Sequence, residues 1–347
     1  MARSARVVKT IEEIDLMNKR ICIPNTDIAV CPIGLGTVGA GVDWDGADAD
    51  RIFDAYLDMG GNLIDSARAY SDWIPPEIGR SERVVGDWLT RSGKRSQITL
   101  VTKGGHPTYR KPDDDLHISR MTPADMRYDI ELSLKTLRVE TIDMYFYHRD
   151  NRAQPIEEVI ETMETFRKEG KIRYYGCSNW QADRIREADA YCEKMGYRSF
   201  AANQALLNLG MKYMNPLPDD TLARMDADMM DYHSKNYRNL AMPYMGVASG
   251  FFHIFAAEGE DGVNGNPYYT PRNVIVAERC MHLMKKYGAT VSQVVLGFFT
   301  TQPFPCVPLY GPKTVGQLID AMGMLNQSFE ENDFNMDGPE LDGAVSM

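Results

Sequence analysis

Asp65, Tyr70, Lys103 and His148 each lie at or just past the end of a short apolar run of this 347-residue chain. A carboxylate, a phenol, an ammonium group and an imidazole can together move a proton to or from an oxygen atom bonded to carbon, while another reagent supplies the electrons. Tyr70 is the acid of such a set. Residues so far apart in sequence can act together only if the fold brings the ends of their apolar runs to one place.

Parallel β-barrels do this, because their active sites form at the C-terminal ends of the strands. Apolar runs alternate with amphipathic segments from about residue 30 to about residue 325. We therefore predict a closed (β/α)8 TIM barrel within a single domain, residues 1–347, rather than an open doubly wound sheet. The expected strands are 31–35, 62–65, 98–102, 142–147, 172–176, 199–203, 238–242 and 305–308.

Helix signals follow most of these runs. Thr122-Pro123-Ala124-Asp125 combines an N-cap, a proline in the first turn and an early carboxylate, which predicts a helix starting there. A second helix is expected from Pro155 to Gly170, where glycine follows late positive charge. Further helices are expected near 47–59, 80–91, 180–195, 272–287, 290–300 and 313–324.

Four segments depart from the repeat. Residues 20–30 alternate around a Pro-Asn turn, which predicts a β-hairpin that plugs the bottom of the barrel. Residues 104–121 and 250–271 are expected to be long irregular loops at the C-terminal face, where substrate specificity resides. The acidic tail, about 326–347, is expected either to be loose or to fold back over the opening.

Composition narrows the class of function. The net charge of −11 without a basic patch argues against a nucleic-acid partner. No apolar stretch approaches the roughly 20 residues of a membrane-spanning helix, and the N-terminus does not resemble a signal peptide, so a cytoplasmic enzyme is expected. The six cysteines show neither C-x-x-C nor metal-ligand spacing, which predicts reduced thiols and no metal. Monomer and homo-oligomer both remain open.

The chain resembles the aldo-keto reductases over about residues 21–325. The motifs that carry the resemblance occur in the family's order: Gly34-Leu35-Gly36-Thr37, Asp65-Ser-Ala-Arg-Ala-Tyr70 followed by Gly79-Arg-Ser-Glu82, Val101-Thr-Lys103, the run ending at His148, Ser178-Asn179-Trp180, Asn203-Gln204, Tyr244 to Gly250, and Gly311-Pro-Lys313-Thr314 with Gln317. Any one of these matches is weak, but chance would rarely place all of them in register.

The resemblance implies a nicotinamide-dependent carbonyl reductase without a Rossmann domain. In the family's mechanism Tyr70 gives its proton to the carbonyl oxygen while the nicotinamide delivers hydride to the carbon. Lys103 eases the release of that proton, and Asp65 orients Lys103. His148 bonds the same oxygen and stabilises the developing alkoxide.

The resemblance also implies a cofactor site. Ser178, Asn179 and Gln204 match positions that bind the nicotinamide carboxamide, and Tyr244 one that stacks on its ring. Lys313 and Thr314 match the positions that hold the 2′-phosphate, which favours NADP, with NAD as the alternative. The remaining expected contacts are Gly36, Thr37, Asp65, Ser249, Gly250, Gly311 and Gln317. Two departures are Asp320-Ala321 in place of the family's Glu-Asn pair, which alters the adenine contact, and Ser66 in place of threonine.

Other interpretations of these residues stay open. Each one alone could be structural: Asp65 as a helix cap, Lys103 as a rim charge, His148 as a buried structural histidine. An aldolase using Lys103 as a Schiff-base nucleophile is a rival, although Asp65 would keep the amine protonated. The second rival is a cofactor-binding, reductase-like subunit or regulator with little turnover.

The expected substrate is a small carbonyl compound or alcohol. Aromatic rings in the loops could stack on a sugar ring, and polar side chains there could bond its hydroxyl groups. A sugar, sugar-acid or keto-sugar derivative is the leading hypothesis, and a hydrophobic aldehyde or ketone is the second. The expected substrate contacts are Trp73, His106, Tyr109, His148 and Phe251.

Overall fold

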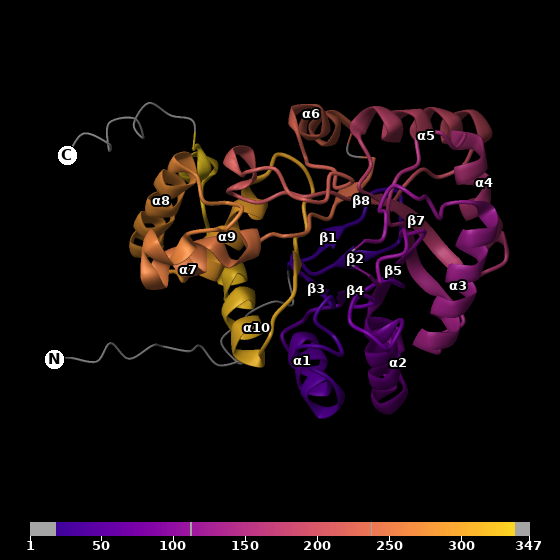
Figure 1. Cartoon of the computed structure of the whole chain (residues 1–347), viewed down its shortest axis with the longest axis horizontal. Coiled ribbons are helices and arrows are strands. Elements are labelled where there is room, and N and C mark those ends of the chain that lie inside the picture. The colour runs from indigo at the N-terminus through magenta and orange to yellow at the C-terminus, as the bar shows by residue number, and fades with distance from the viewer. Residues whose placement is uncertain (1–18, 112, 237, 337–347) are drawn as a thin grey trace.

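The computed structural model describes residues 19–111, 113–236 and 238–336 of the chain. Its main sheet contains eight parallel strands, drawn at the centre of Figure 1: β3 (Gly34–Gly36), β4 (Leu63–Asp65), β5 (Thr99–Gly104), β6 (Ile142–Tyr147), β7 (Ile172–Ser178), β8 (Ala202–Gln204), β9 (Leu240–Ala241) and β10 (Leu309–Tyr310). Their order in the sheet is β10-β3-β4-β5-β6-β7-β8-β9. Consecutive strands are therefore neighbours, as in a βα repeat.

The two ends of this sheet meet through the segment that precedes β10. Ala241 pairs with Cys306 in a parallel bridge, and the Val307 N–H donates to the Ala241 carbonyl at 2.8 Å. These contacts close the (β/α)8 barrel, which confirms the predicted fold. The last strand, predicted at 305–308, is Leu309–Tyr310 in the structure. Pro305 and Pro308 have no N–H to donate to a regular strand ladder.

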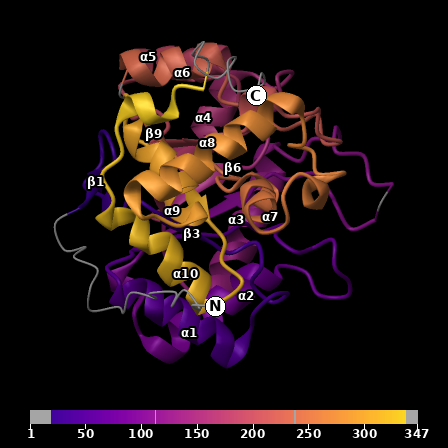
Figure 2. The ribbon, with the colours of Figure 1, turned by 90° about the vertical axis from the view of Figure 1, so that its left-hand side faces the viewer.

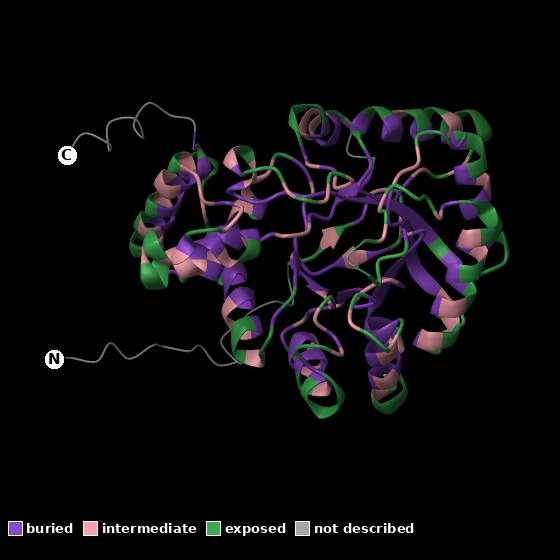
Figure 3. Cartoon of the chain, viewed as in Figure 1, coloured by how far each residue is buried: buried purple, intermediate pink, exposed green. Residues whose placement is uncertain are grey.

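Ten α-helices surround the barrel in the described part of the chain: α1 (Gly46–Asp58), α2 (Arg80–Ser92), α3 (Pro123–Leu137), α4 (Ile156–Lys168), α5 (Ala182–Met195), α6 (Ala227–Asn236), α7 (Phe251–Glu258), α8 (Pro271–Tyr287), α9 (Val291–Gly297) and α10 (Val315–Met322). Their inner faces are buried and their outer faces exposed (Figure 3). Helices α7 to α10 lie together on one side of the molecule (Figures 1 and 2). None of the described helices is long and apolar enough to span a bilayer.

The expected hairpin is present before the first barrel strand. β1 (Ile21–Cys22) and β2 (Ala29–Val30) pair antiparallel. Ile23, Ile28 and Val30 are buried and belong to the same apolar cluster as Leu63 at the start of β4. The hairpin therefore closes the N-terminal end of the barrel, opposite the strand ends that carry the polar residues.

One of the two expected loops is largely helical. Residues 250–271 contain α7, because the apolar run from Phe251 to Ala257 has no turn-forming residue until Gly259. Residues 105–122 are irregular over their described positions, as expected.

The described part of the tail packs on the outer helices. Phe329 lies with its ring centroid 4.8 Å from Tyr287 of α8, and Phe334 lies 5.8 Å from Phe298. These contacts hold residues 329–334 against α8 and the segment after α9, and not over the opening. The rest of the tail lies outside the described residues.

Candidate active site

Lys103 joins three of the four polar residues that the sequence singled out. Its Nζ atom lies 2.7 Å from Asp65 Oδ2, 2.8 Å from the Tyr70 hydroxyl and 2.8 Å from the Ser66 carbonyl oxygen. The Lys103 and Asp65 side chains are each 1% exposed. The ammonium group therefore has all three of its donors aimed at oxygen atoms in a site without bulk water.

Neighbouring strands bring these residues together. Asp65 ends β4, and Lys103 lies near the end of β5, with which β4 is paired in parallel. Tyr70 follows β4 in a turn that the Arg68 N–H ties to the Lys103 carbonyl at 3.0 Å. The turn places the Tyr70 hydroxyl 3.3 Å from Asp65 Oδ2 as well.

His148 completes the set from the next strand. It follows β6, and its backbone N–H donates to the Gly104 carbonyl at 2.9 Å. Its ring meets the Tyr70 ring edge-on, with centroids 5.6 Å apart, and the His106 ring at 4.6 Å. His148 Nδ1 is buried and has no hydrogen-bond partner among the described residues. The structure thus brings all four residues to one end of the barrel.

Burial sets the protonation states of these groups. It lowers the pKa of His148 well below the usual 6.5, so the imidazole is neutral near pH 7. Burial and the Asp65 carboxylate raise the pKa of Tyr70 well above its usual value, which keeps the phenol protonated. The pKa of Lys103 is lowered by burial, and the charge of Asp65 opposes that shift. Tyr70 is therefore available as a proton donor.

A cavity of about 380 Å³ opens above these groups. Most of the expected contacts line it: Gly36, Asp65, Ser178, Asn179, Gln204, Tyr244 and Gly311 from the cofactor set, and Trp73, His106, Tyr109 and His148 from the substrate set. Thr37, Ser249, Gly250, Phe251, Lys313, Thr314 and Gln317 are not among its lining residues.

Two amide side chains form one wall. Asn179 Oδ1 accepts from the Tyr244 hydroxyl at 2.6 Å and from the Ala223 N–H at 3.1 Å, while its Nδ2 donates to the His148 carbonyl at 3.1 Å. Gln204 Nε2 donates to Asp65 Oδ1 at 2.7 Å. These bonds fix the orientation of Tyr244 and of the Asp65 carboxylate. An aromatic face beside amide and hydroxyl groups suits a planar carboxamide-bearing ring.

Lys313 is the cation expected at the far end of the cofactor site. Lys313 is 71% exposed, and its Nζ lies 3.7 Å from Asp43 Oδ1. Thr314 caps α10, since its hydroxyl accepts from the Gln317 N–H at 3.2 Å. Gln317 Oε1 in turn accepts from the Lys313 N–H at 2.7 Å. Thr314 and Gln317 therefore shape the turn that presents Lys313.

Four expected contacts have other places in the structure. Thr37 is fully buried, and its hydroxyl donates to the backbone carbonyl of Asp65 at 2.9 Å, which ties the residue after β3 to the end of β4. Ser249 and Gly250 form a left-handed turn before α7. Phe251 is corrected as a substrate contact: it is fully buried against Phe252, with ring centroids 5.1 Å apart, because α7 turns it into the core.

Arg149 was not among the residues expected at the site. It is buried, lines the cavity, and donates from Nη1 to the His148 carbonyl at 3.1 Å. Its Nη2 lies 3.0 Å from Asp219 Oδ2. The position of Arg149 directly after His148 could have identified it as a site residue. Its partner Asp219 could not have been identified in this way, because it lies in a segment without helix or strand periodicity. All six cysteines are free, and no group of three metal-binding side chains occurs among the described residues.

Comparisons with known proteins agree with this geometry. The family model described as the Aldo/keto reductase family matches residues 32–336. The uncharacterized oxidoreductase YrpG of Bacillus subtilis is 27% identical over 315 residues, which are 90% of this chain and 92% of YrpG. The aldo-keto reductase YhdN of the same organism is 28% identical over 330 residues, 90% of this chain and 91% of YhdN. The NADH-specific methylglyoxal reductase of Escherichia coli is 34% identical over 191 residues, 50% of this chain and 56% of that protein.

A closed barrel with a phenol, an ammonium group, a carboxylate and an imidazole at its C-terminal face defines an oxidoreductase that acts on carbonyl groups. The chain belongs to the aldo/keto reductase family, as the match over residues 32–336 shows. Its cofactor is a nicotinamide nucleotide, and its substrate is a small molecule.

Proposed function

We propose that the chain reduces the carbonyl group of a small aldehyde, ketone, sugar or keto-sugar, with NADPH as its cofactor and Tyr70 as the proton donor. The observation that carries the proposal is the 2.8 Å contact between Lys103 Nζ and the Tyr70 hydroxyl, with Asp65 Oδ2 2.7 Å from the same nitrogen. A phenol beside a fixed ammonium group can release its proton without leaving an unpaired buried charge.

Each residue has a defined part in the proton transfer. Tyr70 gives its proton to the carbonyl oxygen, and the phenolate that results is stabilised by Lys103. Asp65 and the Ser66 carbonyl hold the ammonium group in place. The neutral imidazole of His148 can donate a second hydrogen bond to the same oxygen, which stabilises charge as it develops there. The bound nicotinamide supplies hydride to the carbon.

The choice of NADPH rests on Lys313. Its exposed ammonium group at the turn before α10 suits the 2′-phosphate. Asn179, Gln204 and Ser178 offer the amide and hydroxyl groups that a nicotinamide carboxamide needs, and Tyr244 offers an aromatic face. NADH is the alternative, because the related methylglyoxal reductase is NADH-specific and because Asp43 partly neutralises Lys313.

The cavity mouth supports a substrate with a flat or ring-shaped apolar face. The Trp73 and Tyr109 rings lie with their centroids 6.1 Å apart at the mouth, and each is partly exposed. His106 lines the same cavity, and burial lowers its pKa to about 4, so it is a neutral hydrogen-bonding group. A sugar ring with its apolar face and hydroxyl groups matches this lining, and an aryl aldehyde is the second candidate.

The test of this proposal is turnover by the purified chain. NADPH absorbance is followed with aldoses, keto-sugars, methylglyoxal and aryl aldehydes, and Tyr70→Phe is the matched control that keeps the ring and removes the proton. We expect turnover by the wild type that Tyr70→Phe lowers at least a hundredfold. If aryl aldehydes were reduced rapidly and sugars were not reduced, the order of the two candidate substrate classes would be reversed. If no carbonyl compound were reduced, the proposed function would be overturned.

The cofactor is tested separately. Quenching of tryptophan fluorescence by NADPH and NADH is measured on the wild type and on Lys313→Ala. Tighter binding of NADPH than of NADH, lost in Lys313→Ala, is expected. Equal weakening of both nucleotides would contradict a 2′-phosphate site. We also place the protein in the cytoplasm, because its six free thiols suit a reducing compartment.

A further inference from the structure

A smaller cavity of about 180 Å³ adjoins the catalytic cavity. Ala69, His106 and Tyr109 line both cavities, so they form the partition between them. Arg68 lines the smaller cavity and lies two residues before Tyr70 in the same turn. A substrate whose carbonyl group meets Tyr70 can therefore extend past Ala69 toward Arg68.

Arg68 is a buried cation with two nitrogens that make no hydrogen bond among the described residues, although its charge acts on the carboxyl groups of Asp72 and Glu82. Its side chain belongs to a residue that is only 9% exposed, and Nε and Nη1 are buried without a hydrogen-bond partner among the described residues. A guanidinium group stays charged at any ordinary pH and carries five N–H donors in a rigid fork. A buried charged group without partners is costly, and native structures rarely keep one without a reason.

The two carboxylates at this cavity accept hydrogen bonds from groups other than Arg68. Asp129 accepts from Arg120 at 2.9 Å and from the Gly105 N–H at 2.9 Å. Asp72 accepts from the Gly79 N–H at 2.7 Å, and burial raises its pKa. The lining holds three arginines, Arg68, Arg110 and Arg120, against these two carboxylates, so positive charge is in excess.

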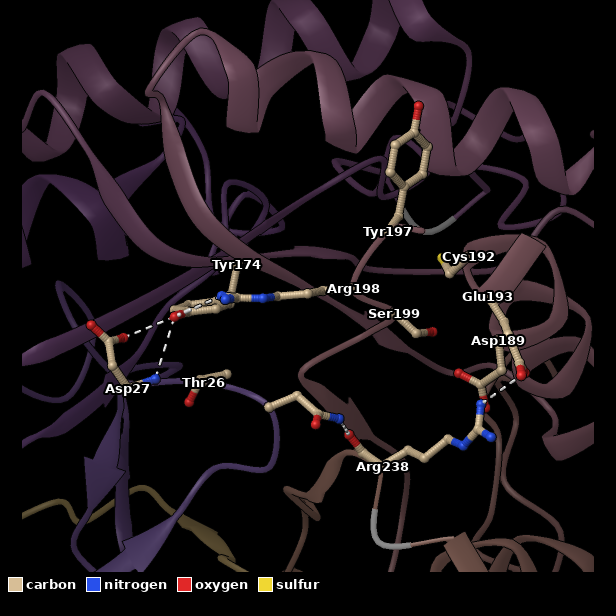
Figure 4. Close-up of a pocket in the computed structure, with 11 residues that line it drawn as sticks. Thr26, Asp27, Tyr174, Asp189, Cys192, Glu193, Tyr197, Arg198, Ser199 and Arg238 are labelled. Carbon is tan, nitrogen blue, oxygen red and sulfur yellow. Dashed lines mark hydrogen bonds and ion pairs between the residues drawn. The ribbon is translucent and has the colours of Figure 1, made fainter. Parts of the chain in front are cut away.

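The other large cavity lacks this excess of positive charge. It measures about 920 Å³ and lies beside the hairpin turn, at the opposite end of the barrel (Figure 4). Its three carboxylates outnumber its two arginines, and Arg238 lies 3.6 Å from Glu193. Asp27 accepts from the Tyr174 hydroxyl at 2.9 Å. An anion is therefore favoured at Arg68 and not there.

We propose that Arg68 forms a subsite for a carboxylate group carried by the carbonyl substrate. The proposal rests on the proposed function and narrows its substrate to an anionic carbonyl compound, such as an aldehyde or ketone that also carries a carboxylate group. A planar carboxylate matches the fork of a guanidinium group through two parallel hydrogen bonds. The carboxylate meets the part of the guanidinium group that lines the cavity, and it fixes the carbonyl group on the Tyr70 side of the partition.

The stability of a neutral variant separates this role from a structural one. Arg68→Met keeps the length of the side chain and removes a buried charge, two nitrogens of which make no hydrogen bond among the described residues. We expect Arg68→Met to unfold at a denaturant concentration equal to or above that of the wild type, because an apolar side chain costs less in such a place. A large loss of stability would mean that Arg68 serves the fold, and would overturn the proposal.

The kinetic test compares matched substrates on the wild type, Arg68→Met, Arg68→Lys and, as a control, Arg138→Met. Arg138 carries the same charge on an exposed part of α3's C-terminus. The substrates are 4-formylbenzoate with its neutral isostere 4-nitrobenzaldehyde, and glyceraldehyde 3-phosphate with glyceraldehyde. Arg68→Met is expected to raise KM for 4-formylbenzoate at least tenfold, with kcat and the neutral partner changed less than twofold.

Other outcomes of these kinetics decide whether Arg68 binds a carboxylate or a phosphate group of the substrate. Arg68→Lys should fall between the wild type and Arg68→Met, and Arg138→Met should match the wild type. Equal effects on 4-formylbenzoate and 4-nitrobenzaldehyde would overturn the subsite and leave the reductase intact. An effect confined to glyceraldehyde 3-phosphate would overturn the choice of carboxylate in favour of phosphate.

A binding measurement keeps the two proposals apart. Terephthalate, a dicarboxylate without a carbonyl group to reduce, is titrated calorimetrically into the wild type and Arg68→Met. Binding that Arg68→Met abolishes would support the subsite even if no carbonyl compound turns over, in which case only the reductase proposal fails. Equal binding by both proteins, or none by either, would overturn the subsite.

Discussion

Lys103 is the residue on which the chemistry of the site depends. Its ammonium group contacts a carboxylate, a phenol and a carbonyl oxygen, all within 2.8 Å. Its charge balances Asp65 when Tyr70 is protonated, and it also stabilises the phenolate after the proton leaves. One buried cation thus serves both the fold and the reaction.

Removing Lys103 should destabilise the protein because Asp65 would then be buried without its counter-ion. We expect Lys103→Met to lower the free energy of unfolding by about 3–5 kcal/mol, the usual cost of breaking a buried pair. The double variant Asp65→Asn/Lys103→Met should recover a large part of that loss, as measured by urea unfolding. Additive effects of the two single changes would show that the pair is not coupled.

Neutral buried histidines make stability depend on pH. Burial lowers the pKa of His233 to about 4, whereas an unfolded histidine titrates near 6.5. Between these values the unfolded chain binds a proton that the folded chain does not, so stability falls as pH drops from about 6.5 to about 4. His233→Phe should reduce that slope by about 1.4 kcal/mol per pH unit. An unchanged slope in urea unfolding at several pH values would contradict the shift.

The ends of the strands determine where the reactive groups lie. β4, β5 and β6 are consecutive neighbours, and Asp65, Lys103 and His148 come from the same end of each. The turn that follows β4 then adds Tyr70. Strand ends also supply expected cofactor contacts, among them Gly36, Ser178 and Gln204. Tyr244 and Lys313 come from segments outside the strands.

The β3–α1 loop gives a prediction about the choice of cofactor. Asp43 Oδ1 lies 3.7 Å from Lys313 Nζ, where it would repel a 2′-phosphate. Asp43→Asn should therefore strengthen NADPH binding by two- to fivefold, a small effect because the side chains are exposed, and leave NADH unchanged. Asp48→Asn in α1 is the control. Equal effects on both nucleotides in fluorescence titrations would place the 2′-phosphate away from Lys313.

Sequence patterns predicted the elements whose signals were local. Thr122 caps α3 as expected, with its hydroxyl accepting from the Asp125 N–H at 3.2 Å. The position of β10 depended on hydrogen bonds to Pro243 and Ala241 across the barrel, which no local pattern reveals. The burial of Phe251 likewise depended on α7 packing against its neighbours, so an aromatic residue in an expected loop was mistaken for a substrate contact.

In the whole molecule, the described part of the tail packs on the outer helices and does not line the cavity. Phe334 is 8% exposed and packs against Phe298 and Phe329. We expect Phe334→Ala to lower the free energy of unfolding by about 3 kcal/mol while KM and kcat stay the same. Ile118→Ala, at a position 64% exposed, should change stability by less than about 0.5 kcal/mol. A change in KM with Phe334→Ala would connect the tail with the cavity.

The barrel as a whole explains why so much of the site could be predicted. The order of βα units fixed which strand ends meet, so Asp65, Lys103 and His148 were found from their positions alone. Arg68 and Arg149 were not predicted as site residues. Their burial and their hydrogen bonding depend on how the loops pack over the C-terminal end of the barrel. Site residues whose position is set by the end of one strand could be predicted. Site residues whose position is set by the packing of loops could not.

The central claim is that Tyr70 is the acid in nicotinamide-dependent carbonyl reduction. The most direct measurement is a single turnover of enzyme-bound NADPH with 4-nitrobenzaldehyde at pH 7, in the wild type and in Tyr70→Phe, with NADPH affinity measured in parallel. We expect a rate at least a hundredfold lower in Tyr70→Phe with unchanged NADPH affinity. Equal rates in the two proteins would contradict it, because the proton would then come from another group.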